Sequence, residues 1–193
     1  MKSPNQFQQM THVQDAEQAR RHVAYWADQG ATSLKAYMQI SRVALAAAIE
    51  EAHTRGMKVT GHLCYLTLFP KAMALELAFA RAGGLLVAGT NPTGSGGVIP
   101  GYSNHRQIEL LVDAGFTPLE ALRIATLNGA TYLGREKSIG SLAAGKQADL
   151  VVVGGDPSAR IADIRNVEIV FRQGIGYDPG KLIASVAGRV GLF

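Results

Sequence analysis

Residues 115–134 read GFTPLEALRIATLNGATYLG, and residues 139–157 read IGSLAAGKQADLVVVGGDP. These segments carry the strongest local signals in the chain. Thr117 is the predicted N-cap of a helix, with Pro118 at the first helical position and Glu120 three residues after the cap. The apolar stripe that follows predicts that one face of this helix is buried.

The rest of this region predicts a second short helix and then short strands. Asn128 is the predicted cap of that helix, and Gly134 ends it. Residues 140–142 and 150–153 are predicted strands joined by a turn at residues 144–146. Further on, the sequence predicts a hairpin and a last helix, at residues 167–172, 175–177 and 179–186.

This order of helix pair, turn and strands resembles the C-terminal end of the amidohydrolase superfamily. Members of that superfamily are metal-dependent hydrolases built on a TIM barrel, and the segment matching residues 139–153 enters a small β-sandwich beside the barrel. Residues 166–178 and 181–191 are similar to the imidazolonepropionase-like and Xaa-Pro-dipeptidase-like branch. The resemblance implies metal-dependent hydrolysis of a C–N bond in a small amide or dipeptide-like substrate.

The composition bounds the class of protein. The 193 residues suffice for one domain or a domain with a small appendage, and 47% hydrophobic with 18% charged residues is not a disordered composition. The charge of +4 comes from scattered Lys and Arg residues, so nucleic acid is not an expected partner. One cysteine, no membrane-length apolar run and no signal-peptide core lead us to expect a cytoplasmic protein with no membrane partner.

Strands and helices alternate in the first half, which is typical of parallel βα units. Asp15 and Ser41 are predicted helix caps. The other predicted elements are strands at residues 32–37, 58–62 and 85–89, the last one buried, and helices at 70–82 and 107–114. The fold class is therefore α/β: partial TIM-barrel-type βα units, resembling barrel strands 4, 5 and 8, at residues 1–136, and a β-rich, sandwich-like region with a terminal helix at residues 137–193.

Three polar residues lie at predicted strand ends, where TIM-barrel enzymes place their working residues. The resemblance implies that Lys35 matches a lysine carboxylated by carbon dioxide, which bridges divalent metal ions, by resemblance zinc. It also implies that His62 matches a histidine metal ligand. An amine must be neutral to react with carbon dioxide, and burial favours the neutral form. Carbamate oxygen and neutral imidazole both suit a divalent metal.

Asn91 departs from the family pattern. The resemblance places an aspartate there, as ligand and general base, whereas an asparagine side chain cannot accept a proton at neutral pH. Losing a positioned base costs about 10²–10⁴-fold in rate. Structural readings stay open for all three residues: Lys35 as a solvated surface group, His62 as a structural histidine, and Asn91 as a turn residue before Pro92.

Other family features have no counterpart in this sequence. No His-x-His occurs in it, and the stretch from His62 to Asn91 holds one βα unit where the family pattern needs three. We therefore expect a shortened, truncated hydrolase with weak or no turnover, which oligomerises with itself or pairs with a complementary chain. The alternatives are a non-enzymatic α/β binding or interaction module, and one subunit of a split barrel.

Overall fold

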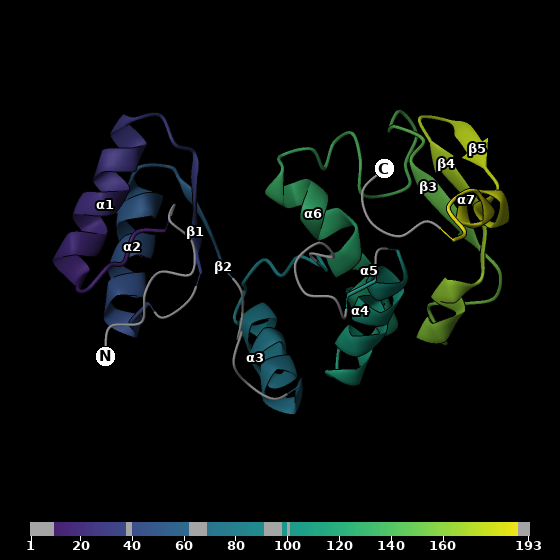
Figure 1. Cartoon of the computed structure of the whole chain (residues 1–193), viewed down its shortest axis with the longest axis horizontal. Helices are drawn as coiled ribbons and strands as arrows, with labels where there is room; N and C mark the ends of the chain where they lie inside the picture. The colour runs from purple at the N-terminus through teal and green to yellow at the C-terminus, as the bar shows by residue number, and fades with distance from the viewer. Residues whose placement is uncertain (1–9, 38–39, 62–68, 91–97, 100, 189–193) are drawn as a thin grey trace. The chain divides into compact units, whose positions relative to one another are not determined.

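The computed structural model describes residues 10–37, 40–61, 69–90, 98–99 and 101–188, with the backbone alone for residues 69–73. The chain divides into two compact units, Met1–Thr67 and Leu68–Phe193 (Figure 1). Helices and small sheets occur in both, which confirms the mixed α/β class. The domain boundary expected at residues 136/137 stays a prediction. Within the described ranges, no helix has the length and apolar character needed to cross a membrane.

The first unit consists of two helices and two strands, in the order α1 (Ala16–Asp28), β1 (Ser33–Ala36), α2 (Arg42–Thr54) and β2 (Lys58–Gly61). Both helices begin at the predicted caps, because the Asp15 carboxylate accepts from Gln18 N at 2.7 Å and the Ser41 hydroxyl accepts from Ala44 N at 3.2 Å. β1 and β2 pair in parallel. The predicted parallel unit is confirmed.

Small side chains let α1 and α2 pack closely. Ala19, Ala44 and Ala47 form one buried cluster between the helices. A second cluster of Val23, Ala52 and Met57 receives Leu34 from β1 and Val59 from β2. Side chains alternate along a strand, so Leu34 and Val59 mark the sheet face that the helices cover. The residues directly before and after Leu34 and Val59 in the two strands occupy the opposite face.

The second unit begins with four helices: α3 (Phe69–Arg81), α4 (Tyr102–Asp113), α5 (Pro118–Ala125) and α6 (Leu127–Tyr132). The predicted capping box of α5 is confirmed, with Thr117 and Glu120 exchanging hydrogen bonds. A buried cluster joins α4 and α5 and includes partly buried residues of α3 and of the segment before residue 90. Its fully buried members are Leu111, Phe116, Ala121 and Ile124.

The C-terminal part of this unit is a three-stranded antiparallel sheet in the order β3 (Leu150–Val153), β4 (Val167–Arg172) and β5 (Ile175–Tyr177). The 3-10 helix η1 (Ile161–Arg165) precedes β4, and α7 (Pro179–Ser185) follows β5. Gln173 and Gly174 adopt φ values of 52° and 81°, as a type I′ hairpin turn requires. The predicted hairpin and last helix are confirmed.

The strand predicted at residues 85–89 is wrong. This segment pairs with no strand among the described residues, although its side chains alternate: Leu86 and Ala88 pack against the helical core, whereas Leu85 and Val87 are exposed. A ladder needs a neighbouring strand. Here a neighbouring helix supplies a backbone partner instead, because Ala88 N donates to the carbonyl of Ile124 in α5 at 3.4 Å.

Three local predictions also need correction. Helix α4 begins at Tyr102, not near Gln107. Residues 140–142 form a bend and no strand. Asn128 lies inside α6 and does not cap it. Its side-chain amide instead donates to the carbonyl of Leu86 at 2.8 Å. That side chain therefore links α6 to the extended segment.

Candidate functional site

Lys35 is the one predicted site residue whose position is described. It lies in β1 opposite Thr60 of β2, on the sheet face away from the helices. In a closed βα barrel this is the face that points inward. The side chain is exposed, with Nζ 5.4 Å from the centroid of the Tyr37 ring. The expected burial of the Lys35 amine is thus absent from the described structure.

The other two predicted residues, His62 and Asn91, lie outside the described residues. In the sequence, His62 follows Gly61, the last residue of β2, and Asn91 follows Thr90. Whether the three side chains converge stays a prediction. Within the described ranges, no three His, Cys, Asp or Glu side chains come together as metal ligands. A metal centre built around Lys35 therefore needs further donors from elsewhere.

Helix α4 holds the backbone just before Asn91. The Gln107 amide donates to the carbonyl of Gly89 at 3.3 Å, and the Thr90 hydroxyl donates to Asn104 Oδ1 at 2.9 Å. These two contacts anchor the end of the extended segment to the first turns of the helix. The sequence analysis did not single out Asn104 or Gln107, because the helix that it predicted began only at residue 107 and left Asn104 outside it.

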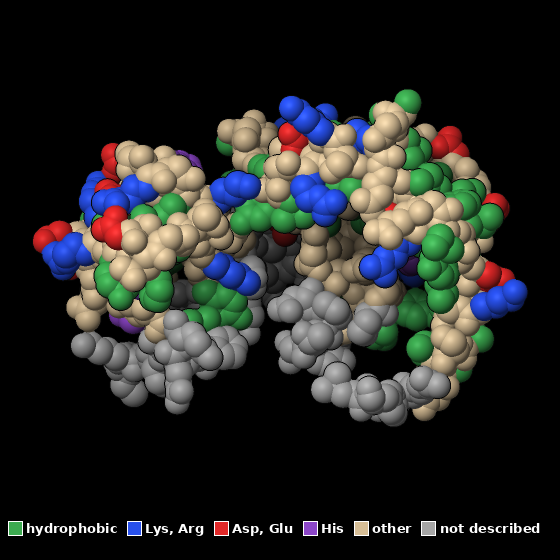
Figure 2. Space-filling model, turned by 90° about the horizontal axis from the view of Figure 1, so that it is seen from above, with side chains coloured by type: hydrophobic (Ala, Val, Ile, Leu, Met, Phe, Trp, Pro, Cys, Tyr) green, Lys and Arg blue, Asp and Glu red, His purple; other side chains and the backbone are tan. Residues whose placement is uncertain are grey.

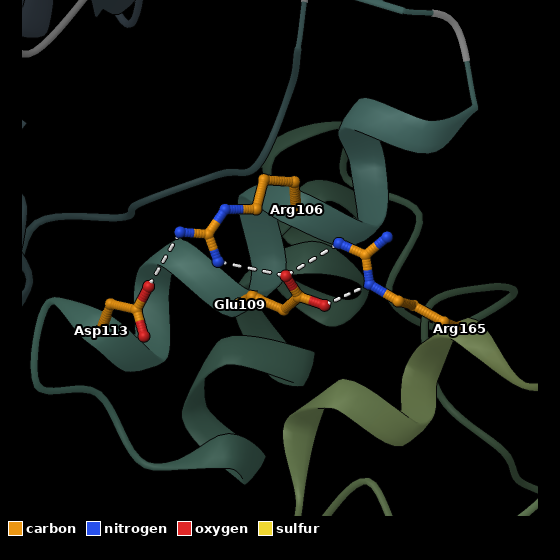
Figure 3. Close-up of polar contacts among 4 residues, drawn as sticks. All are labelled: Arg106, Glu109, Asp113 and Arg165. Carbon is orange, nitrogen blue, oxygen red and sulfur yellow. Dashed lines mark hydrogen bonds and ion pairs between the residues drawn. The ribbon is translucent and has the colours of Figure 1, made fainter.

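Glu109 of α4 is a carboxylate that is shielded from water and has a strongly lowered pKa (Figure 3). Arg165 of η1 donates to both its oxygens, at 2.5 Å from Nε and 2.9 Å from Nη2. Arg106 donates to Glu109 at 3.1 Å and to Asp113 at 3.1 Å. Bidentate Arg–carboxylate pairs of this kind are strong and geometrically specific.

The Arg165 guanidinium, helped by Arg106, holds the pKa of Glu109 at about 2, although desolvation alone would raise it. The carboxylate is therefore an anion at neutral pH. With both oxygens engaged by arginines, it is poorly suited to accept a proton or bind a metal. We assign this network to structure: it joins α4 to the segment that leads into β4. The sequence analysis missed it, because residues 109 and 165 are far apart in the chain.

Residues of the segment 139–157 also serve local structure. Asp149 accepts from the backbone N of Gln173 at 2.7 Å, which stabilises the β4–β5 turn. Lys146 Nζ donates to the carbonyl of Glu136 at 2.5 Å and to the Ser141 hydroxyl at 2.6 Å.

A glycine of the same segment fits closely against a buried acid. The Asp163 carboxylate pairs with Arg160 and also accepts from Asp156 N at 3.0 Å, and these two contacts together lower its pKa. Gly155 has a φ of 98°, and a Cβ there would lie 2.5 Å from Asp163 Oδ2. Glycine is therefore required at position 155 for both conformation and space.

The model of the Amidohydrolase family matches residues 68–175, more than half of the chain. The chain belongs to this family, which confirms the resemblance stated above. An imidazolonepropionase of Symbiobacterium thermophilum is 34% identical over 128 residues, covering 66% of this chain and 29% of that protein. An adenine deaminase of Paracoccus denitrificans is 31% identical over 97 residues, covering 49% of this chain and 15% of that protein.

Solved structures share the fold. Molinate hydrolase superposes with a TM-score of 0.57 at 16% identity, covering 93% of this chain and 57% of that one. A Xaa-Pro dipeptidase superposes with a TM-score of 0.51 at 17% identity, covering 86% of this chain and 59% of that one. The chain thus spans less than a third of these two curated relatives and under two thirds of these two structures.

Proposed function

We propose that this chain is a shortened amidohydrolase-type hydrolase for C–N bonds of small amide or dipeptide-like substrates, and that alone it turns over weakly or not at all. The carrying observation is the family match over residues 68–175. The relatives support the reaction class, because the reactions that the names deaminase, imidazolonepropionase and dipeptidase describe break C–N bonds. A cytoplasmic location belongs to the same proposal.

The proposed domains are a barrel-type part at residues 1–136 and a β-rich part at residues 137–193. Lys35, as a carbamate, and His62 are the proposed metal ligands. The strand face of Lys35 supports this assignment, since it is the face that a barrel turns inward. A bound divalent metal, zinc in this proposal, supplies a Lewis acid that polarises the substrate carbonyl and acidifies water.

Asn91 stands at the proposed position of the base. Its amide can donate and accept hydrogen bonds and so orient a water or a carbonyl, but it cannot take a proton at neutral pH. The contacts of Gln107 with Gly89 and of Asn104 with Thr90 fix the backbone on which this position depends. Weak turnover follows from the missing base.

Metal content of the purified chain, measured by elemental analysis, tests the ligands. We expect about one divalent ion per chain, lost in Lys35→Met and in His62→Ala. Lys58→Met is the matched control, because Lys58 lies on the neighbouring strand β2 but at its opposite end. A chain that binds no metal, or whose two variants keep it, contradicts the ligand assignment.

Activity tests the missing base separately. Where the metal binds, Asn91→Asp should raise hydrolysis of a dipeptide or amide substrate by up to about 10²–10⁴-fold. Robust hydrolysis by the unaltered chain would contradict the proposal of weak turnover.

The second candidate is a binding module or one subunit of a split barrel. Two observations favour it: the asparagine at position 91, and the extended segment at residues 84–90, which has no strand partner among the described residues. A neighbouring reading frame with His-x-His at a strand end, whose product co-purifies with this chain, would support the split barrel. Unchanged behaviour of Lys35→Met and His62→Ala would support a module without a metal.

A further inference from the structure

Five consecutive residues before position 91 each contact a helix. We call residues 86–90 the held segment, and the partners of these residues lie in α4, α5 and α6. In chain order the contacts are those of the Leu86 carbonyl with Asn128, the Val87 side chain with Gly129, the Ala88 N–H with the Ile124 carbonyl, the Gly89 carbonyl with Gln107, and the Thr90 hydroxyl with Asn104.

The helix contacts replace the pairing of a sheet. Among the described residues the held segment pairs with no strand, so its backbone polar groups need other partners. Leu86 and Ala88 pack against the helical core, whereas Leu85 and Val87 are 43% and 40% exposed. Figure 2 shows hydrophobic side chains reaching the surface of the second unit. Within the described structure, α4, α5 and α6 therefore determine where this segment lies.

Asn128 makes the side-chain contact that is best shielded from water. Its amide donates to the Leu86 carbonyl at 2.8 Å in a partly buried place, whereas the side-chain hydrogen bonds of Gln107 and Asn104 are exposed. A shielded hydrogen bond is electrostatically stronger, and a shielded carbonyl that loses its donor stays unsatisfied. The Leu86 carbonyl is therefore the point at which a side chain ties the held segment most firmly to the helices.

We propose that Asn128 is a positioning residue for the reaction centre: by fixing the Leu86 carbonyl, it sets where the held segment delivers residue 91. The inference rests on the proposed function, which gives position 91 the place of the base. Only four residues separate Leu86 from position 91, so a displacement at Leu86 passes along the segment. Catalytic groups need placement within about 0.5 Å. Asn128 acts through the backbone and takes no part in the chemistry itself.

Distances between two spin labels test the positioning without any hydrolysis. The labels are attached to Asn91→Cys and Leu119→Cys in a Cys64→Ser background, which removes the single native thiol. Leu119 lies on α5 and is 65% exposed. Asn128→Asp keeps the shape of the side chain but turns a carboxylate toward the Leu86 carbonyl. We expect pulsed electron paramagnetic resonance to show a shifted or broadened distance distribution in this variant.

Asn166→Asp is the matched control. Asn166 also donates its side-chain amide to a backbone carbonyl, that of Gly154, but it lies directly before β4. The control should keep the distances of the parent, and circular dichroism verifies that each variant is folded. If Asn128→Asp does not fold, Asn128→Ser removes the amide without adding a charge and is judged in the same way. A folded Asn128 variant with the distances of the parent, or an equal change in the control, would overturn the proposal.

Activity then connects the positioning to the proposed reaction. The rise in hydrolysis expected of Asn91→Asp should fall at least about tenfold when Asn128→Asp is added, and it should persist with Asn166→Asp. A purely structural Asn128 would lower stability but leave that rise unchanged, which would overturn the proposal. Absence of hydrolysis in Asn91→Asp would contradict the proposed function, and the spin-label distances would then decide the inference by themselves.

Discussion

The two units differ in what their polar residues do. In the second unit, the polar side chains with the strongest interactions bind one another or the backbone: Glu109 with Arg165, and Asp149 with the turn at Gln173. In the first unit, Lys35 lies exposed on a sheet face that the helices leave open. Asp149, in the segment that carries the family resemblance, thus stabilises the fold here, and the proposed chemistry depends on residues elsewhere in the chain.

The largest expected effect comes from the core of the second unit. Phe116 is buried and its ring lies 5.8 Å from the Arg81 guanidinium, so Phe116→Ala should lower the free energy of unfolding by about 3–5 kcal/mol. Trp26, the single tryptophan, lies in the first unit. Circular dichroism should therefore show a destabilised transition in urea, while tryptophan fluorescence shows the first unit unchanged. An equal shift of both signals would contradict the expectation that only the second unit is destabilised.

The next effect concerns the Glu109 network. Arg165→Ala removes the bidentate partner of a shielded carboxylate and should lower the free energy of unfolding. Arg106→Ala is the matched comparison and should cost less, because Arg106 gives Glu109 one hydrogen bond where Arg165 gives two. Urea titrations of the three proteins at pH 7 measure this order. The reverse order would show that Arg106, not Arg165, holds the carboxylate.

The same network predicts a pH dependence. The pKa of Glu109 is about 2 in the folded chain against 4.5 ordinarily, so the unfolded chain binds the proton first. The stabilisation is complete above about pH 4.5 and is lost as the pH falls toward 2. Between pH 5 and 3 the parent protein should lose more stability than Arg165→Ala does. Parallel pH profiles would contradict this account.

A smaller effect is expected at the hairpin. Asp149→Ala leaves the backbone N–H of Gln173 without its carboxylate acceptor, at an expected cost of about 1 kcal/mol. Hydrogen exchange of the Gln173 amide should accelerate, with little change in α4. An unchanged exchange rate would mean that Asp149 does not stabilise the turn.

Local signals account for much of what the sequence predicted correctly. The caps at Asp15, Ser41 and Thr117 and the turn at Gln173 lie within a few residues of the elements that they define. The strand predicted at residues 85–89 was wrong because an apolar run reports burial, whereas a ladder depends on a distant neighbour. The Glu109–Arg165 pair escaped prediction for the same reason. Lys35 was placed on its strand by sequence, but its exposure depends on what covers the sheet.

The central claim is that Lys35 serves metal binding and Arg165 serves stability. Metal content and the free energy of unfolding, both measured on Lys35→Met and Arg165→Ala, test it together. The account predicts that Lys35→Met loses its metal while the metal-free protein stays within about 0.5 kcal/mol of the parent, as expected for an exposed residue. Arg165→Ala should keep the metal and lose stability. A Lys35→Met variant that keeps its metal, or an Arg165→Ala variant as stable as the parent, would contradict it.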